Sequence, residues 1–215
     1  MSNRRAELVA WPDDIEGRYA VAEQAVQVLH GGGLVVYPTD TVYGLGVDPA
    51  FPASIRRVFE VKGRPDEKAI IWLVDSLNGA RAACAVDERA ERLAEVFWPG
   101  PLTLVLRRRD PPPDALPTLG VRVPAHPAAL AILRAMDGPV ATTSANPSGE
   151  PSSQTAAEAR ATLGSAVDLI IDGGPAPGGT ESSVLDLSVS PPRLLRAGAI
   201  QTPEIEAALG ERIDA

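Results

Sequence analysis

The residues best suited to chemistry are the two lysines of the chain, Lys62 and Lys68, which share one short segment, VKGRPDEKAI. Every other Lys/Arg position is an arginine. Lysine carries a compact ammonium on a flexible stem, whereas arginine carries a planar guanidinium. The two cations differ most in the geometry with which they bind phosphate oxygens. Arg64 lies between the lysines, and Gly63 and Pro65 favour a turn that would hold the three cations together. The segment predicts an anion site, with a solvated loop as the alternative.

Three polar loops follow buried segments that read as strands. In residues 38–46, PTDTVYGLG, hydroxyls and glycines would allow close approach of a ligand; the alternative is a turn in which Asp40 bonds its own backbone. Residues 142–149, TTSANPSG, crowd polar side chains that need a ligand or a helix-cap network as partner. Residues 173–183 are rich in glycine, which is compatible with a lid, but they lack both common phosphate-loop spacings.

Composition restricts the kinds of protein that could carry these loops. The chain has 215 residues, of which 45% are hydrophobic and 22% charged, as is usual for a globular domain. It has no apolar run of about 18 residues and no apolar secretory core near its start, so we expect a cytoplasmic protein without a membrane partner. Cys84, the only cysteine, excludes an internal disulfide and a thiolate zinc cage, and we expect it to be buried. A net charge of −8 disfavours a long nucleic acid but permits a small anion in a local cationic pocket.

Alternating helix and strand patterns predict an α/β fold. Helices are expected over residues 19–30, 54–61, 87–97, 126–136 and 155–163, with Ser54 as the N-cap of the second. Strands are expected over residues 34–37, 69–74, 102–106, 120–123, 140–143, 169–171, 184–187 and 194–196. Because the helices are spaced irregularly, we expect a single domain over residues 1–215, with its core at about 20–200 and a mixed parallel and antiparallel sheet.

The ordered motifs resemble those of the YrdC/TsaC family of threonylcarbamoyl-AMP synthases. The motifs are YPTDTVYGLG, KGRPDEKAI, FWPGPLTLVL, VRVPAHP, TSANPSG, ESSVLDL and LLRAGAI, and they span about residues 20–200. The resemblance implies a twisted mixed sheet with a concave binding face. It also implies a reaction that joins L-threonine, bicarbonate and ATP to threonylcarbamoyl-AMP and pyrophosphate, which supports threonylcarbamoylation of adenosine 37 in tRNA. Leu73 stands where many members have histidine, so one polar contact near threonine would be missing.

The same resemblance assigns roles to individual positions. Around threonine it places Thr41, Arg122, Ser144 and Ser182. Around ATP it places Lys62, Arg64, Lys68, Thr118, Asn146 and Arg196, with Lys62 and Arg64 as the catalytic cations. Magnesium would accompany ATP through phosphate oxygens and water, since no dense carboxylate cluster is visible and Asp40 is the only nearby acid. The product would pass to proteins that transfer threonylcarbamoyl groups to tRNA.

Other classes of function remain open at this point. No Ser-His-Asp or Cys-His constellation is visible, and we expect structural roles for both histidines, with His126 as a cap or turn residue. One alternative is a module that binds double-stranded RNA or tRNA without catalysis, and weak tRNA binding could also accompany the synthase. A second is a carbamoyl-transfer role like that of the related domain in hydrogenase-maturation proteins, but the acylphosphatase domain and cysteine-rich zinc fingers that accompany that domain are missing here.

Overall fold

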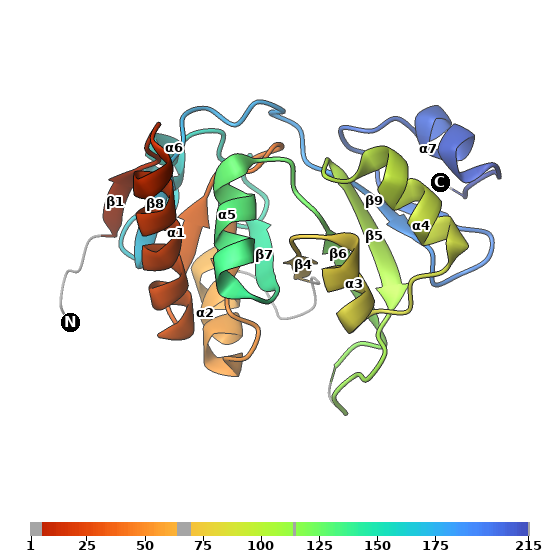
Figure 1. Cartoon of the computed structure of the whole chain (residues 1–215), viewed down its shortest axis with the longest axis horizontal. Helices are drawn as coiled ribbons and strands as arrows, with labels where there is room; N and C mark the ends of the chain where they lie inside the picture. The colour runs from red at the N-terminus through yellow and green to blue at the C-terminus, as the bar shows by residue number, and fades with distance from the viewer. Residues whose placement is uncertain (1–5, 64–69, 114, 215) are drawn as a thin grey trace.

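A ten-stranded mixed sheet runs the length of the molecule in the order β1-β8-β2-β3-β7-β4-β6-β5-β9-β10 (Figure 1). The computed structural model describes residues 6–63, 70–113 and 115–214. The strands are β1 (Glu7–Ala10), β2 (Val35–Tyr37), β3 (Gly44–Val47), β4 (Ile71–Leu73), β5 (Leu102–Arg107), β6 (Thr118–Arg122), β7 (Val140–Ser144), β8 (Leu169–Asp172), β9 (Ser183–Asp186) and β10 (Arg193–Arg196). The helices are α1 (Ile15–His30), α2 (Pro52–Lys62), α3 (Leu77–Ala83), α4 (Glu88–Phe97), α5 (Pro127–Met136), α6 (Ala156–Leu163) and α7 (Thr202–Leu209).

The predicted mixture of strand directions is confirmed. Strands β1 and β2 both run parallel to β8, and β4 runs parallel to β6. Strand β3, in contrast, is antiparallel to both of its neighbours, β2 and β7. Strands β2 and β3 form a hairpin, whereas none of the adjacent pairs β3–β7, β7–β4 and β4–β6 is consecutive in the chain, so segments far apart in the sequence become neighbours.

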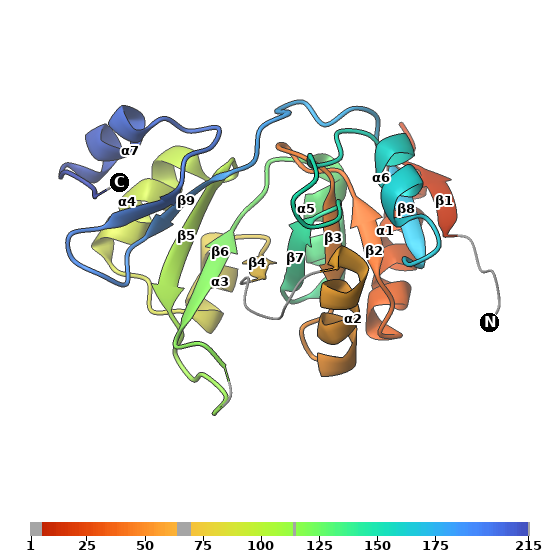
Figure 2. The same ribbon diagram turned by 180° about the vertical axis from the view of Figure 1, so that it is seen from behind.

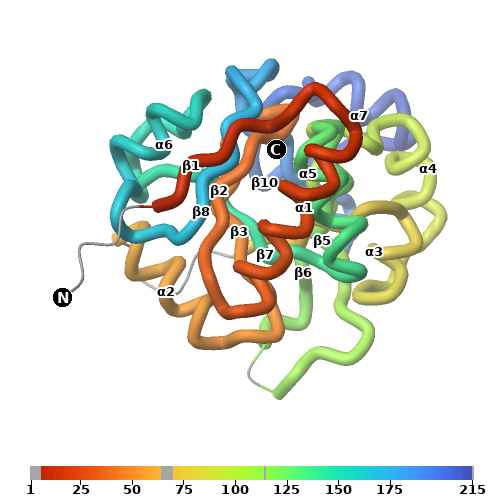
Figure 3. The backbone as a smooth tube through the Cα atoms, turned by 60° about the vertical axis from the view of Figure 1, so that its left-hand side comes forward, coloured from red at the N-terminus to blue at the C-terminus, as the bar shows by residue number. Residues whose placement is uncertain are grey.

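Helices cover both faces of the β1 end of the sheet. Helices α1 and α5 lie side by side on one face, where they pack against Val35 and Tyr37 of β2 (Figures 1 and 3). Helices α2 and α6 lie on the opposite face and share a core with Leu34 and Val36 (Figure 2). Burial on both faces explains why residues 34–37 read as a continuous apolar run. At the other end, α3, α4 and α7 pack with β5, β6 and β9, and Cys84 is fully buried there, as expected.

Polar caps fix the starts of α4 and α5, and the cap at His126 was expected from the sequence. The Asp87 carboxylate accepts from the backbone N–H of Ala90 at the start of α4, and the Nδ1 atom of His126 accepts from Ala128 at the start of α5. The expectation for Ser54 is wrong. Helix α2 already begins at Pro52, and the Ser54 hydroxyl donates instead to the carbonyl of Gly32.

Two strands and two helices of the fold were not predicted from the sequence. Part of the loop expected over residues 38–46 is strand β3, whose small residues carry little strand signal. Strand β1 is a short, largely exposed edge strand. Helix α3 has only seven residues, and helix α7 begins at a capping box between Gln201 and Glu204 that was overlooked. None of the described helices combines the length and apolarity that a membrane crossing requires.

The connection between β8 and β9 links the two ends of the sheet. It crosses over the upper edge in Figure 2, because β8 is second and β9 ninth in the strand order. The Tyr43 hydroxyl donates to the carbonyl of Gly174 at 2.6 Å, and the Gly179 N–H donates to the backbone carbonyl of Thr41 at 2.9 Å. At Gly178 a side chain is excluded, since a Cβ atom would lie 2.5 Å from the Asp40 carbonyl oxygen. Hydrogen bonds and close packing therefore hold the glycine-rich connection between β8 and β9 against residues 40–43, which follow β2.

Candidate functional site

A cavity of about 620 Å³ opens over the central strands β3, β7, β4 and β6. Polar residues from several distant segments line it. Those that the sequence singled out are Thr41, Lys62, Arg122, Ser144, Asn146, Ser182 and Arg196. The structure thus brings together most of the predicted site within the part of the chain that it describes.

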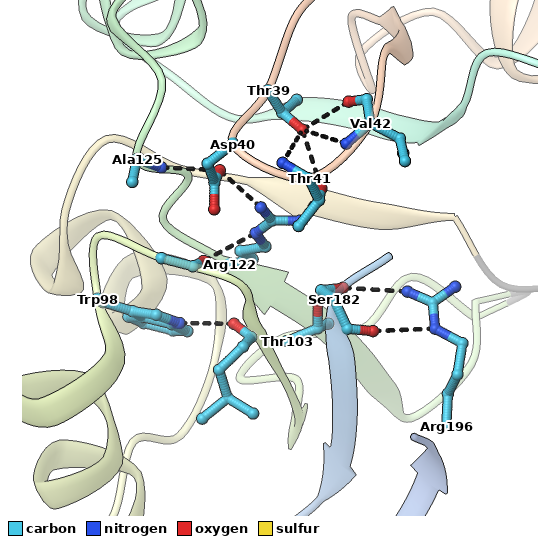
Figure 4. Close-up of polar contacts among 12 residues, drawn as sticks. Thr39, Asp40, Thr41, Val42, Trp98, Thr103, Arg122, Ala125, Ser182 and Arg196 are labelled. Carbon is cyan, nitrogen blue, oxygen red and sulfur yellow. Dashed lines mark hydrogen bonds and ion pairs between the residues drawn. The ribbon is translucent and has the colours of Figure 1, made fainter. Parts of the chain in front are cut away.

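Arg122, at the end of β6, is a buried cation of the cavity wall, with 4% of its surface exposed. Figure 4 shows its guanidinium held from three sides. The Nε atom donates to the carbonyl of Gly100 at 2.9 Å, Nη1 to the Thr41 hydroxyl at 3.0 Å, and Nη2 to the Asp40 carboxylate at 2.6 Å. Burial lowers the pKa of Arg122, and the Asp40 carboxylate opposes that shift. Arginine nevertheless stays protonated at neutral pH, so the cavity holds a fixed positive charge.

The loop after β2 is organised by Thr39 rather than by Asp40. The Thr39 hydroxyl accepts from the N–H groups of Thr41 and Val42 and donates to the Val42 carbonyl at 2.6 Å. Asp40 does not close a turn on its own backbone, which was the alternative from the sequence. Its carboxylate instead accepts from Arg122 and from the backbone N–H of Ala125 at 2.9 Å. The turn thereby presents the Thr41 hydroxyl to the cavity, beside Arg122.

Lys62, the last residue of α2, is buried and ties that helix to the loop after β7. Its ammonium donates to the carbonyls of Ser144 at 2.6 Å and Asn146 at 2.8 Å, and lies 3.3 Å from the Asn146 side-chain oxygen. Its own carbonyl accepts from Ser148 at 2.9 Å. Lys62 therefore positions two other predicted site residues. Arg64 and Lys68 lie outside the described residues, so the structure does not place the remaining two cations of the segment.

Ser182 and Arg196 form a second polar cluster across the cavity. The Arg196 guanidinium donates to the carbonyl and the hydroxyl of Ser182, both at 3.0 Å, and is paired with the Glu181 carboxylate. The buried Thr103 lies 2.9 Å from the same Ser182 hydroxyl (Figure 4). Glu181 also accepts from Ser152 at 2.7 Å, which joins the β10 side of the cavity to the loop after β7.

Thr118 differs from the other predicted residues. It is the first residue of β6, pairs with Arg107, and is not among the described residues that line the cavity.

Three residues that hold the site together, Thr39, Glu181 and Ser152, had no role predicted from the sequence. Glu181 stood within the quoted motif ESSVLDL, next to Ser182, and its charge was the one available signal.

Among the described residues that line the cavity, two are acidic, Glu150 and Glu181. Among the described residues, no group of three or more His, Cys, Asp and Glu side chains is placed to hold a metal ion. Asp40 is committed to Arg122, and Glu181 to Arg196. Two carboxylates in and beside the cavity are therefore paired with arginines.

Comparisons with known proteins agree with this geometry. Residues 27–198 match the Sua5/YciO/YrdC family model, which is described as "Telomere recombination". The chain is 40% identical to the threonylcarbamoyl-AMP synthase of Pyrococcus abyssi over 206 residues, covering 92% of this chain and 61% of that protein. It is 36% identical to a putative threonylcarbamoyl-AMP synthase of Mycobacterium tuberculosis, covering 92% and 93% of the two chains.

The fold has a close counterpart among solved structures. The structure of P. abyssi Sua5 complexed with L-threonine superposes with a TM-score of 0.89 at 38% identity, covering 97% of this chain and 62% of that one. The chain spans 61% of the length of the P. abyssi relative and 56% of a similar Bacillus subtilis synthase.

Proposed function

The chain belongs to the Sua5/YciO/YrdC family, and from that premise we propose that it joins L-threonine, bicarbonate and ATP to give threonylcarbamoyl-AMP and pyrophosphate. The product would serve threonylcarbamoylation of adenosine 37 in tRNA, after transfer to a protein that modifies tRNA. The relatives named as threonylcarbamoyl-AMP synthases and the relative solved with L-threonine support this proposal.

The observation that carries the proposal is the buried Arg122 beside Thr41. Arginine has five N–H groups, and its hydrogen bonds to described residues use three of them. The two others would serve an amino-acid carboxylate, with the Thr41 hydroxyl as a further partner. Because Asp40 holds the guanidinium in place, this contact would require little rearrangement on binding.

The nucleotide would bind on the Arg196 side of the cavity. Arg122 and Arg196 both line the cavity, and the positive charge of Arg196 contributes to lowering the pKa of Arg122. We assign the amino-acid carboxylate to Arg122 and a phosphate of ATP to Arg196. Asn146 and Ser144, positioned by Lys62, lie on the third side of the cavity.

The reaction needs positioning more than a protein nucleophile. The threonine amine would add to CO₂ derived from bicarbonate and lose a proton, giving a carbamate. A carbamate oxygen would then attack the α-phosphorus of ATP, and pyrophosphate would leave. Fixed cations would stabilise the charge that develops at phosphorus. The ATP contacts that the family resemblance assigns to Arg64, Lys68 and Thr118 stay predictions. Mg²⁺ would enter as part of the nucleotide substrate, held by phosphate oxygens and water.

Pyrophosphate release tests the proposal. Release from ATP and Mg²⁺ should require both bicarbonate and L-threonine, and Arg122→Met should lower the rate with threonine about 100-fold or more. Arg56→Met removes an exposed arginine on α2 and should leave the rate unchanged. Release without threonine, or full activity of Arg122→Met, would contradict the proposal. Salt-sensitive tRNA binding without any turnover would favour the RNA-binding alternative.

A further inference from the structure

The glycine-rich residues 173–179 lie in the connection between β8 and β9 that crosses the upper edge of the molecule (Figure 2). We call this segment the strap. Its sequence, GGPAPGG, is compatible with a lid that moves when ligands bind, because glycine permits many backbone conformations. The contacts of the strap indicate a fixed segment instead.

Most backbone N–H groups of the strap are bonded. Five of its seven residues have an N–H group, because Pro175 and Pro177 have none. Four of these groups donate to described residues: Gly173 to the Tyr43 hydroxyl at 3.3 Å, Gly174 to the Asp172 carboxylate at 3.0 Å, Ala176 to the carbonyl of Gln154 at 2.8 Å, and Gly179 to the carbonyl of Thr41 at 2.9 Å. A lid would have to break these bonds each time it opened.

Burial holds the middle of the strap as well. Ala176 is buried in the hydrophobic core that also contains Tyr43, and the Tyr43 hydroxyl donates to the carbonyl of Gly174 at 2.6 Å. The backbone of Tyr43 donates to the carbonyl of Ser153 at 2.9 Å and accepts from the Ala145 N–H at 2.8 Å. Tyr43 therefore joins the strap to the loops after β2 and β7, both of which contribute residues to the cavity wall.

Two glycines allow the strap to lie directly against the backbone of Thr41. Gly179 has a φ of +63°, in the left-handed region that glycine adopts at little cost. At Gly178 a Cβ atom would lie 2.5 Å from the Asp40 carbonyl oxygen and 3.1 Å from the Thr41 Cα atom, so a side chain there would push the two segments apart. The loop after β2 resists such a displacement, because the Asp40 carboxylate is paired with Arg122.

We propose that the strap is a fixed brace rather than a lid, and that Gly178 is a positioning residue that keeps the Thr41 hydroxyl beside Arg122. The strap contacts the backbone of Thr41, whereas the Thr41 hydroxyl accepts from Arg122 at 3.0 Å on the cavity side. A misplacement of about 1 Å in a site can lower activity about 100-fold. The positioning role rests on the proposed function, because it assumes that Thr41 contacts the amino-acid substrate.

Amide hydrogen exchange of the native chain tests the fixed brace. In a peptide that spans residues 173–179, four of the five amides should exchange at least about 100-fold more slowly than in the unfolded chain. Saturating L-threonine with α,β-methylene-ATP, which cannot release pyrophosphate, should change these rates by less than about 3-fold. Exchange at the rate of the unfolded chain, or slow exchange only with the ligands bound, would indicate a lid and overturn the inference.

A matched pair of glycine variants tests the positioning role. Gly178→Ala should raise the dissociation constant for L-threonine, measured by calorimetry below the Tm of the variant, at least about 5-fold. Gly138→Ala adds the same methyl group between α5 and β7, where a Cβ atom would lie 3.8 Å from the Met136 carbonyl oxygen, and should leave the constant unchanged.

The outcomes separate positioning from stability and from the proposed function. A lower Tm of Gly178→Ala with a smaller change in the dissociation constant would show a merely structural role and overturn the inference. If Gly178→Ala does not fold, hydrogen exchange of the native chain decides between brace and lid. Absence of threonine binding to the native chain would overturn the proposed function, whereas the exchange of the strap amides would still test the brace.

Discussion

Replacing Asp40 with alanine should destabilise the fold strongly, although Asp40 itself is a loop residue. The change would leave the Arg122 guanidinium, which is 4% exposed, without its carboxylate partner at 2.6 Å. Removing one partner of a buried ion pair typically costs about 3–5 kcal/mol, because the remaining charge has neither water nor a counter-charge. For a chain of this size, that cost corresponds to a fall in Tm of about 6–20 °C.

A double-mutant cycle that combines Asp40→Ala with Arg122→Met separates the cost of the unpaired Arg122 charge from the loss of other Asp40 contacts. Asp40→Ala also removes the bond from the Ala125 N–H, which is worth about 1 kcal/mol. In the Arg122→Met background only that smaller loss should remain, so the coupling energy should be about 2 kcal/mol or more. Asp40→Asn keeps an oxygen acceptor for both donors while removing the charge, and should fall between wild type and Asp40→Ala.

Urea denaturation followed by circular dichroism would measure these differences as shifts of the midpoint at constant m-value. The reasoning would be refuted by a cost below about 1 kcal/mol for Asp40→Ala, or by the same cost in both backgrounds. Either result would mean that solvent or another group satisfies Arg122 in the folded state.

Three further outcomes are expected. Burial raises the pKa of the Cys84 thiol to about 11, so the native chain at pH 8 should react with Ellman's reagent only after unfolding in urea; rapid native reaction would contradict its burial. Burial lowers the pKa of His126, whose Nδ1 must stay unprotonated to accept from Ala128. The unfolded chain therefore binds a proton at His126 more readily than the folded chain, so the free energy of unfolding should fall as pH drops below about 6.5. His126→Asn keeps a capping group and should remove that part of the pH dependence, as measured by thermal unfolding. Glu181→Ala should raise the KM for ATP about 5- to 10-fold because Arg196 loses its orientation, while chemical denaturation should show a stability change below about 1 kcal/mol, since the pair is partly exposed; an unchanged KM would argue against that role.

Local signals in the sequence predicted the helices whose first residues include a capping or turn residue. Helices were expected over residues 87–97 and 126–136, with His126 as a cap or turn residue, and in the structure Asp87 and His126 cap α4 and α5. Strand β3 was missed because two of the four residues of GLGV are glycines, which are depleted in strands, and the segment becomes a strand by pairing with β2 and β7. Such a segment depends on its neighbours, which local propensity does not describe.

The site could be predicted as a set of residues but not as a set of contacts. Lys62 was expected close to the ATP phosphates, which stays a prediction, but no local pattern indicated that its ammonium bonds the Ser144 and Asn146 carbonyls. The pairing of Asp40 with Arg122 joins two segments that are far apart in the chain, and no local pattern predicts it. The family resemblance supplied the residues, while the partners required the three-dimensional sheet.

The register of the central strands determines the site as directly as it determines the core. Arg122 and Leu73 face the cavity because Val121 and Trp72, one residue earlier in each strand, pack on the opposite face. A slip of one residue in β6 would bring Val121 into the cavity and force the Arg122 guanidinium into the core. Burial of Val121 therefore also selects the register of β6 that presents the guanidinium to a ligand. Selection for stability and selection for ligand binding act here on the same pairing, which explains how a buried arginine, costly in isolation, is retained in the middle of the sheet.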